Sequence, residues 1–237
     1  MRRSGRRITV VVLVAVGIVS AFFLISWASG LIWPSPEANG IRIGLPEPQY
    51  ESDVSIEEAL LNRRSVRQYT GEPLMVQEVS QLVWATQGIT DPRGLRTAPS
   101  AGALYPLEVY VVVGDVEGLA VGVYRYKPQE HELEKVLEGD MRAELSDAAL
   151  GQASVRTAAI DIVITAVYER TTVQYGDRGI RYVHLEAGHA AQNLCLQATA
   201  MDLGIVTAGA FTDDQVNDVL NLPENEQPLY IIPIGRK

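Results

Sequence analysis

An apolar segment near the N-terminus constrains this chain more than any other feature of its sequence. Residues 8–33 carry no charged side chain, and the first twenty of them are almost entirely apolar. Twenty helical residues span about 30 Å, which is the thickness of the hydrocarbon layer of a membrane. Four arginines precede the segment and predict a cytoplasmic N-terminus, namely Arg2, Arg3, Arg6 and Arg7. We therefore expect residues 1–33 to form a single-pass membrane anchor, with the rest of the chain outside the cytoplasm.

A cleaved secretory signal is the alternative interpretation of this leader. Ser26-Trp27-Ala28 could serve as a small-residue cleavage site, and Arg6-Arg7 partly matches a twin-arginine export signal. The apolar stretch exceeds the roughly 7–15 residues of an ordinary signal peptide, which favours an uncleaved anchor. Both interpretations place the body of the chain on the outer side of the cytoplasmic membrane.

The body is acidic although the leader is basic. The 237 residues include 20 basic and 29 acidic side chains, and every acidic one lies after residue 33. Without the four leader arginines, 16 basic side chains face 29 acidic ones, which gives the body a formal charge of −13. This charge disfavours nucleic acid as a partner, because phosphate binding needs a basic face. The single cysteine, Cys195, excludes an intrachain disulfide and a cysteine-rich metal site.

The pattern of apolar and turn-forming residues predicts a mixed α and β domain over residues 55–237. Residues 34–54 contain four prolines and are expected to form an extended linker. We expect helices at 55–62, 75–87, 140–150, 181–203 and 212–222, and strands at 107–113, 121–126, 132–136, 160–167 and 229–234. Ser55 and Thr212 are predicted to begin capping boxes, and Gly88 and Gly204 to end helices. Helices and strands do not alternate strictly, so we expect the α+β class rather than a doubly wound sheet.

The densest basic cluster of this acidic body is the segment Arg63-Arg64-Ser65-Val66-Arg67. Arginine presents a planar fork of donors that matches a phosphate group, and serine adds a neutral donor. The same arginines could instead complement the dipole of the helix that they end and remain solvated. The segment therefore predicts either an anion site or a solvated helix end.

A loop of small residues, Pro99-Ser100-Ala101-Gly102-Ala103-Leu104-Tyr105-Pro106, leads directly into the strand expected at 107–113. Small side chains let backbone N–H groups approach a planar or anionic ligand closely, although a structural turn would use the same residues. The spacing around Ser100 also partly matches the nucleophile elbow of serine hydrolases. That elbow needs a strand before the serine and a helix after it, whereas here a polar loop precedes and a strand follows. A serine hydrolase is therefore disfavoured.

The histidines do not predict a metal site. His184 and His189 are five residues apart, about 140° around a helix, so they do not share a face. Glu186-x-x-His189 could serve a di-iron site only with a second copy, and the chain has one. The sequence also lacks a glycine-rich dinucleotide motif and a phosphate loop. A flavin or nucleotide would therefore bind without a Rossmann turn.

Four motifs together resemble the nitroreductase superfamily of FMN-dependent oxidoreductases. The closest resemblance is to its SagB-type branch, which includes thiazole- and oxazole-forming dehydrogenases of peptide natural products. The motifs are the basic segment, the small-residue loop extended back to Arg96, the stretch Tyr175-Gly176-Asp177-Arg178-Gly179-Ile180-Arg181-Tyr182 leading into Glu186-Ala187-Gly188-His189, and Ala208-Gly209-Ala210-Phe211. The resemblance covers nearly the whole body, from about Ile56 to the C-terminus.

The resemblance implies a homodimer that binds FMN at the subunit interface, built on a mostly antiparallel sheet flanked by helices. Arg63, Ser65 and Arg67 match positions that hold the FMN phosphate and ribityl chain, with Arg64 alongside. The residues from Pro99 to Gly102 match a loop that packs from the partner subunit against the isoalloxazine.

The remaining site residues follow from the same resemblance. Ala208 and Gly209 match the backbone that faces the reactive edge of the flavin, where an N–H can bond N5. Arg236 matches a C-terminal basic residue that reaches the phosphate. Tyr175 is the candidate catalytic residue, as a proton donor to a reduced substrate, although a structural tyrosine is equally compatible with the motif.

One departure concerns the residue before Tyr175. The azoline-oxidising members carry a Lys-Tyr pair at this place, with both residues implicated in catalysis, whereas this chain has Gln174-Tyr175. Glutamine is neither a cationic acid nor a base, so the resemblance does not predict azoline oxidation here.

The sequence therefore predicts an FMN-dependent oxidoreductase that acts on a small electrophile, such as a nitroaromatic or a quinone, or on a modified peptide. The flavin itself would carry hydride and electrons between a small-molecule donor and acceptor. The second hypothesis is a flavin-binding module without turnover, acting as a sensor, a store or a partner subunit. No metal is expected in either case.

Overall fold

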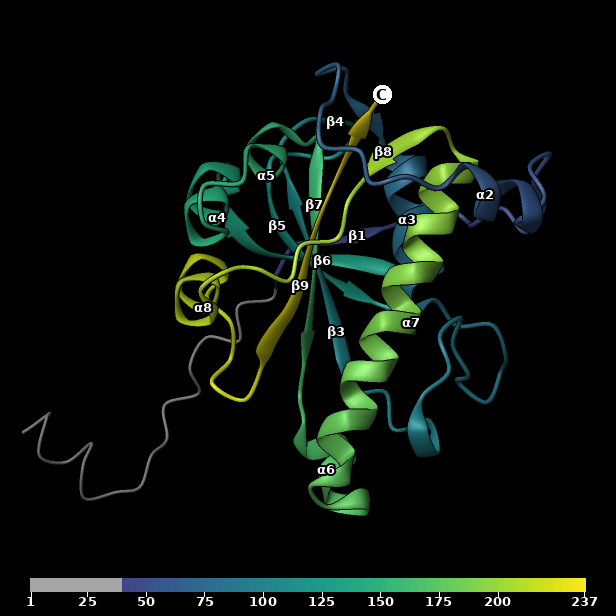
Figure 1. The fold of residues 1–237 in the computed structure, drawn as a ribbon, viewed down its shortest axis with the longest axis vertical. Helices are drawn as coiled ribbons and strands as arrows, with labels where there is room; N and C mark the ends of the chain where they lie inside the picture. The colour runs from purple at the N-terminus through teal and green to yellow at the C-terminus, as the bar shows by residue number, and fades with distance from the viewer. Residues whose placement is uncertain (1–39) are drawn as a thin grey trace, which may run out of the picture. The chain divides into compact units, whose positions relative to one another are not determined.

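A computed structural model describes residues 40–237 of the protein (Figure 1). The membrane anchor expected at residues 1–33 and the first residues of the expected linker lie outside this range. Among the described residues, no helix combines the length and the apolar character that crossing a membrane requires.

A seven-stranded sheet forms the centre of the domain. Its strands are β1 (Arg42–Gly44), β3 (Leu107–Val113), β5 (Gly122–Lys127), β6 (Glu132–Glu138), β7 (Ile160–Ala166), β8 (Leu203–Ile205) and β9 (Gln227–Arg236). They lie in the order β1-β6-β5-β3-β7-β9-β8, and each neighbouring pair is antiparallel. Two short strands, β2 (Leu74–Met75) and β4 (Val116–Glu117), pair separately in parallel. The expected α+β fold with a mostly antiparallel sheet is confirmed.

Helices cover both faces of this sheet, as Figure 1 shows. They are α2 (Ile56–Asn62), α3 (Val76–Gln87), α4 (Arg142–Ala148), α5 (Ala153–Thr157), α6 (Glu169–Tyr175), α7 (Arg178–Ala200) and α8 (Asp213–Leu220), with one 3-10 turn, η1 (Ala101–Ala103). α3 and α7 pack on one face of the sheet, and α4, α5 and α8 pack on the other.

The two cores follow from the alternation of side chains along each strand. In β3, Leu107, Val109 and Val111 face α3 and α7, whereas Tyr110 and Val112 face the opposite helical layer. All are buried, so both faces of this central strand are largely apolar, and its sequence is a hydrophobic run interrupted only by Glu108. The strand predicted at 107–113 is confirmed for this reason.

Most helix starts were predictable, but several helix ends were not. Ser55 caps α2 as expected, because its hydroxyl accepts the Glu58 N–H at 3.1 Å. The capping box expected at Thr212 is wrong, since the Thr212 side chain makes no capping bond; α8 ends at Asn221 in a left-handed conformation. Gly88 ends α3 in an extended rather than the expected left-handed conformation. Glycine is needed there because a Cβ would lie 2.1 Å from the Trp84 ring.

The long helix is shifted from its predicted position. We expected residues 181–203, but α7 begins at Arg178 and ends at Ala200, and Leu203–Ile205 forms β8. Asp202 turns the chain with a φ of 56°, and β8 then pairs antiparallel to the end of β9. Leu203 and Ile205 are buried by this pairing, so β-sheet burial outweighs the helical periodicity of the segment.

Several elements lie in segments where none was expected, including β1, β4, α5 and α6. β1 pairs with β6 within the segment expected as an extended linker. α6 follows β7 and carries Gln174 and Tyr175 at its C-terminal end, before Gly176. This helix turns out to position part of the candidate site.

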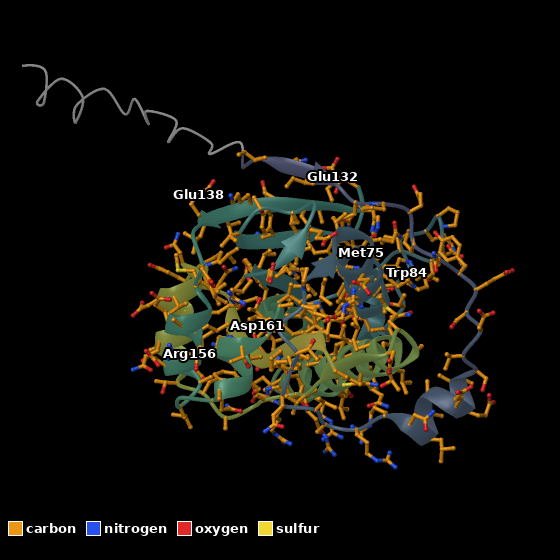
Figure 2. All side chains as sticks on the ribbon, turned by 90° about the horizontal axis from the view of Figure 1, so that it is seen from above. Met75, Trp84, Glu132, Glu138, Arg156 and Asp161 are labelled. Atoms are coloured by element: carbon orange, nitrogen blue, oxygen red, sulfur yellow. The ribbon has the colours of Figure 1, made fainter. Side chains whose placement is uncertain are left out.

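Asp161 is a charged side chain in the middle of β7 and is fully buried. Within residues 40–237 neither of its carboxylate oxygens has a hydrogen-bond partner. The nearby cation, Arg142, is bound instead to both carboxylate oxygens of Asp140 and to the Ala158 carbonyl. Burial therefore raises the pKa of Asp161 well above its ordinary value. Figure 2 shows Asp161 inside the domain, in contrast to Arg156 at the surface.

Candidate functional site

The predicted basic segment, residues 63–67, lies along the free edge of β8. The Val66 N–H donates to the Ile205 carbonyl at 2.9 Å, and Ser65 and Ile205 pair in parallel. Ile205 precedes Ala208 by only three residues, so the segment is held against the sheet close to the predicted flavin-facing backbone. The structure brings two of the predicted cofactor-binding segments together at this edge.

Two of the three arginines in the segment have free guanidinium groups. Arg64 is the exception, because its Nη1 donates to the carbonyls of Leu61 and Arg63 at 2.9 and 2.8 Å. In the part of the chain that the structure describes, no hydrogen bond or ion pair involves the guanidinium group of Arg63 or Arg67. These two cations are available to an anion, whereas Arg64 is used to close the end of α2.

Gly209 is exposed, whereas the preceding Ala208 is buried. Ala208 exchanges two backbone hydrogen bonds with Ile231, at 2.8 and 2.9 Å, which fix its position next to β9. A Cβ on Gly209 would meet nothing closer than the Tyr230 ring at 3.9 Å. A planar ligand can therefore approach the Gly209 backbone closely.

Arg236 has a guanidinium group that is already paired within the chain. It lies at the end of β9, and its two Nη atoms bind the two carboxylate oxygens of Glu78. Its Nε donates to the Pro73 carbonyl at 3.3 Å. Unlike Arg63 and Arg67, Arg236 must give up this pair before it can contact an anionic ligand.

The predicted small-residue loop lies at the other end of α7. A Cβ on Gly102 would lie 2.9 Å from the Tyr175 hydroxyl and 3.4 Å from the Gln174 amide, so α6 packs directly over the loop. Ser100 accepts the Tyr105 N–H at 2.9 Å through its hydroxyl. The structure therefore unites the predicted loop with the predicted catalytic residue, Tyr175.

The basic edge and the small-residue loop do not meet within one chain. α7 has 23 residues and is about 35 Å long. Its first turns adjoin α6, whereas β8 follows its C-terminal end, as Figure 1 shows. A single ligand could contact both regions only if they came from different subunits.

A buried polar cluster lies behind the loop, and its role was not predicted from the sequence. Glu186 on α7 is only 3% exposed, and its Oε1 has no partner within residues 40–237. Burial raises the pKa of Glu186 to about 7, although the Ser100 hydroxyl and the charge of Arg96 lower it. Arg96 bonds Gln87 at 2.8 Å and stacks on the Tyr105 ring at 4.5 Å. The glutamate and arginine both lie in the quoted motifs, but only the fold shows that they adjoin.

The histidines and serines form other contacts. His184 bonds the Tyr168 hydroxyl at 2.6 Å, and residues 40–237 contain no group of three His, Cys, Asp or Glu side chains that could hold a metal. His131 contacts the Ser80 hydroxyl at 2.8 Å, the Pro46 carbonyl at 3.1 Å and the Tyr126 hydroxyl at 2.9 Å. Ser80 is fully buried, so this pair fastens the segment around Pro46 to the core and offers no nucleophile to a substrate.

The model of the nitroreductase family matches residues 60–236. The nitroreductase-type protein MJ1384 of Methanocaldococcus jannaschii is 47% identical over 197 residues, which are 83% of this chain and 97% of that protein. The microcin B17-processing protein McbC of Escherichia coli is 28% identical over 158 residues, which are 64% of this chain and 58% of McbC. A solved nitroreductase-type structure from Anabaena variabilis has a TM-score of 0.73 at 36% identity and covers 83% of this chain. This chain spans only 42% of that structure's chain.

These matches confirm the resemblance inferred from the four motifs. The family match begins within α2 and ends at Arg236, so it includes the basic segment, the small-residue loop and the backbone at Gly209. The similarity to a microcin-processing protein agrees with the branch that the motifs resemble. The chain belongs to the nitroreductase family.

Proposed function

We propose that this protein is an FMN-dependent oxidoreductase and that it acts as a homodimer with FMN at the subunit interface. The observation that carries the proposal is the pair of free guanidinium groups, Arg63 and Arg67, at the β8 edge of an otherwise acidic body. Such cations match a phosphate dianion, and their loss of hydration is compensated only when an anion binds.

The residues present fit this cofactor. Arg63, Ser65 and Arg67 would hold the phosphate, and the exposed backbone of Gly209 would face the flavin ring. A bound FMN would supply the hydride and electron transfer. The chain itself would neutralise the phosphate, hold the ring against the backbone and present the Tyr175 hydroxyl, a hydrogen-bond donor, next to Gly102.

The dimer is supported by the separation of the two halves of the site along α7. Apolar side chains on α2 and α7 also lie exposed in the single chain: Leu60 is 55%, Leu61 72% and Leu185 52% exposed. Exposed apolar side chains of this kind are typical of an interface, because burying them releases water.

We propose a small electrophile, of the nitroaromatic or quinone type, as the substrate. The side chain beside Tyr175 that reaches the small-residue loop is the neutral amide of Gln174, which can orient an oxygen acceptor but cannot titrate. A modified peptide is the second substrate class, supported by the similarity to a microcin-processing protein. The alternative function is a flavin-binding module without turnover.

The test is the purified full-length protein in mild detergent. We expect a yellow protein from which heat releases FMN at about one per chain. Chemical reduction followed by mixing with menadione or nitrofurazone should restore the oxidised spectrum at a rate that saturates with acceptor. A flavin that is reoxidised only by oxygen at the free-flavin rate would identify the module instead, and a colourless protein that binds no added FMN would refute both functions.

We further propose a cell-membrane location, with residues 1–33 as a single-pass anchor, residues 34–54 as a linker and residues 55–237 as an FMN-binding domain outside the cytoplasm. The proposal rests on the apolar leader and its four arginines. A protease added to intact cells should then degrade the domain, and complete protection in cells with a permeable outer layer would contradict it. NAD(P)H is absent from that compartment, so a membrane quinone or a redox partner would supply the electrons.

A further inference from the structure

The small-residue loop is held in an unfavourable backbone conformation. Gly102, Ala103 and Tyr105 have φ values of 62°, 53° and 46°. Only glycine adopts this left-handed region freely, so the backbone of Ala103 and Tyr105 is strained. A conformation of this kind persists only where surrounding contacts impose it, and those contacts can be identified.

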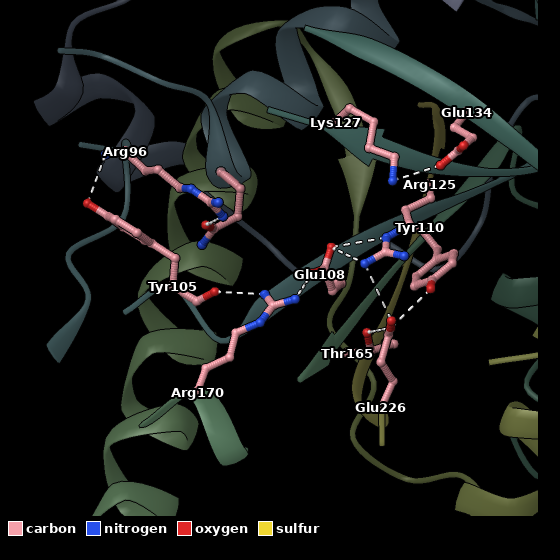
Figure 3. Close-up of polar contacts among 11 residues, drawn as sticks. Arg96, Tyr105, Glu108, Tyr110, Arg125, Lys127, Glu134, Thr165, Arg170 and Glu226 are labelled. Atoms are coloured by element: carbon pink, nitrogen blue, oxygen red, sulfur yellow. Dashed lines mark hydrogen bonds and ion pairs between the residues drawn. The ribbon is translucent and has the colours of Figure 1, made fainter. Parts of the chain in front are cut away.

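Arg170 of α6 makes the contact that fixes the end of the loop. Its Nη1 donates to the Tyr105 carbonyl at 3.0 Å, and its Nη2 donates to Glu108 Oε1 at 2.6 Å (Figure 3). One guanidinium group thus joins the last strained residue of the loop to the start of β3. A lysine, which presents one compact charge, cannot reproduce both bonds in this fixed fork geometry.

Glu108 is itself immobilised from the opposite side. Arg125 donates to Glu108 Oε2 at 3.1 Å through Nε and lies 3.0 Å from it through Nη2. Arg125 also lies 3.6 Å from Glu226, which is buried and accepts hydrogen bonds from Tyr110 at 3.0 Å and Thr165 at 2.8 Å. Figure 3 shows this row of alternating charges running from β5 to the loop. Arg170, Glu108, Arg125 and Glu226 thus form one connected network of ion pairs.

The same helix touches the loop a second time. Five residues after Arg170, Tyr175 and its neighbour Gln174 lie against Gly102. The position of both side chains over the loop therefore depends on the position of α6 relative to Tyr105. The two hydrogen bonds of Arg170 fix that position.

We infer that Arg170 is a positioning residue of the redox site: it fixes α6 and the strained loop relative to each other, so that Tyr175 and Gln174 stand at a defined place over Gly102. This inference rests on the proposed function, since the loop acts on chemistry only if it packs against a flavin. A merely structural ion pair at a half-exposed position would add little stability and would not affect turnover.

The test compares Arg170→Ala, Arg170→Lys and Glu108→Gln with Arg156→Ala in the full-length protein. Arg156 is the matched control, because its Nη2 also lies 2.6 Å from a carboxylate, that of Asp147, on the far side of the sheet. The measurements are bound FMN per chain, the visible flavin spectrum, kcat and KM for menadione, and amide hydrogen exchange at residues 100–105 and 169–175.

We expect Arg170→Ala to lower kcat at least tenfold, shift the flavin spectrum and accelerate exchange at 100–105, while FMN content stays near that of the unmodified protein. Glu108→Gln should act in the same direction, Arg170→Lys should recover only part of the loss, and Arg156→Ala should change none of these values. If Arg170→Ala lowers the thermal midpoint but leaves kcat, KM and spectrum within twofold, the positioning role is refuted. If the unmodified protein binds no flavin, the proposed function fails, and the exchange measurement alone decides whether Arg170 holds the loop.

Discussion

Arg236 binds Glu78 through both ends of its guanidinium group, with Nη1 2.7 Å from Oε1 and Nη2 2.8 Å from Oε2. The pair joins the end of β9 to the first turn of α3, across 158 positions of sequence. Glu78 also accepts the Met75 N–H at 2.8 Å and so caps α3. The expected C-terminal phosphate ligand is therefore already neutralised by a carboxylate of its own chain.

Replacing Glu78 with glutamine should strengthen FMN binding. The amide keeps an oxygen for the Met75 N–H but removes the charge that competes with phosphate for Arg236. We expect FMN affinity to rise about three- to tenfold, which corresponds to roughly 0.7–1.4 kcal/mol, measured by fluorescence quenching of added FMN. Glu144→Gln, which removes an exposed carboxylate from the first turn of α4, is the control and should leave the affinity unchanged. Weaker binding in Glu78→Gln would mean that the ion pair builds the site instead of competing with it.

The three arginines of the basic segment should contribute unequally. Changing Arg63 and Arg67 together to alanine removes two free cations, each worth roughly 1.5–3 kcal/mol in charge-assisted bonds, so FMN should be lost during purification. Arg64→Ala should retain FMN within about threefold, because this guanidinium group is bound to Leu61 and Arg63 carbonyls. The measurement is FMN per chain by absorbance after gel filtration. A double variant that stays yellow would overturn the phosphate assignment.

Asp161 should lower stability at neutral pH. Burial raises its folded-state pKa, so the folded protein holds a proton that the unfolded chain releases above pH 3.8. Stability contributed by this proton is full below pH 3.8 and is lost as the pH rises toward the folded-state pKa, at about 1.4 kcal/mol for each pH unit. Asp161→Asn should therefore raise the free energy of unfolding at pH 7 and flatten its decline above pH 4.

The control for this measurement is Asp147→Asn, since Asp147 lies at the surface. Urea unfolding of both variants between pH 4 and 8 is the experiment. An Asp161→Asn variant with the stability and pH profile of the unmodified protein would show that a bound water or a structural change satisfies the carboxyl.

His131 should make the anchoring of the segment around Pro46 sensitive to acid. Burial lowers the pKa of His131 from its ordinary 6.5, so the unfolded chain takes up a proton before the folded protein does. The stability that depends on neutral His131 is complete above pH 6.5 and is lost as the pH falls through the folded-state pKa. We expect the protection of the amides of residues 42–54, taken relative to the intrinsic exchange rate at each pH, to fall below pH 6.

Replacing His131 with asparagine should remove this pH dependence while tolerating the local φ of 51°. Protection at residues 42–54 would then be low at every pH from 5 to 8. His189→Asn is the control, because His189 is exposed on α7. An unchanged pH profile in His131→Asn would assign the effect to another group.

The sequence predicted the elements that depend only on residues close to one another in the chain. β3 and β7 are mostly apolar runs, with Glu108 and Asp161 as their charged residues. Ser55 caps α2 through a neighbour three positions away. α6 escaped prediction because its seven residues include Thr171, Thr172 and Val173, whose branched side chains disfavour helix. Leu203–Ile205 fits helical periodicity as well as a buried strand, and only pairing with β9 decides between them.

The candidate site could likewise be predicted only in part from the sequence. The residues that form motifs, such as Arg63, Ser65 and Gly102, could be identified from the sequence alone. Their partners could not, because Glu78 lies 158 positions from Arg236 and Arg170 lies 62 from Glu108. The sequence therefore predicts which groups are available for chemistry, whereas the fold determines which of them are already neutralised or held in place.

The bridge between Ser65 and Ile205 also determines how the sheet ends. β8 is the last strand of the sheet, and an unpaired strand edge invites pairing with other chains and aggregation. Val66 occupies this edge with a hydrogen bond, and the Tyr69 ring covers Gly204 and Gly235 beneath it. The positive charges on the segment repel a second copy at the same edge. Protection of the sheet edge and the proposed cofactor binding thus involve the same five residues.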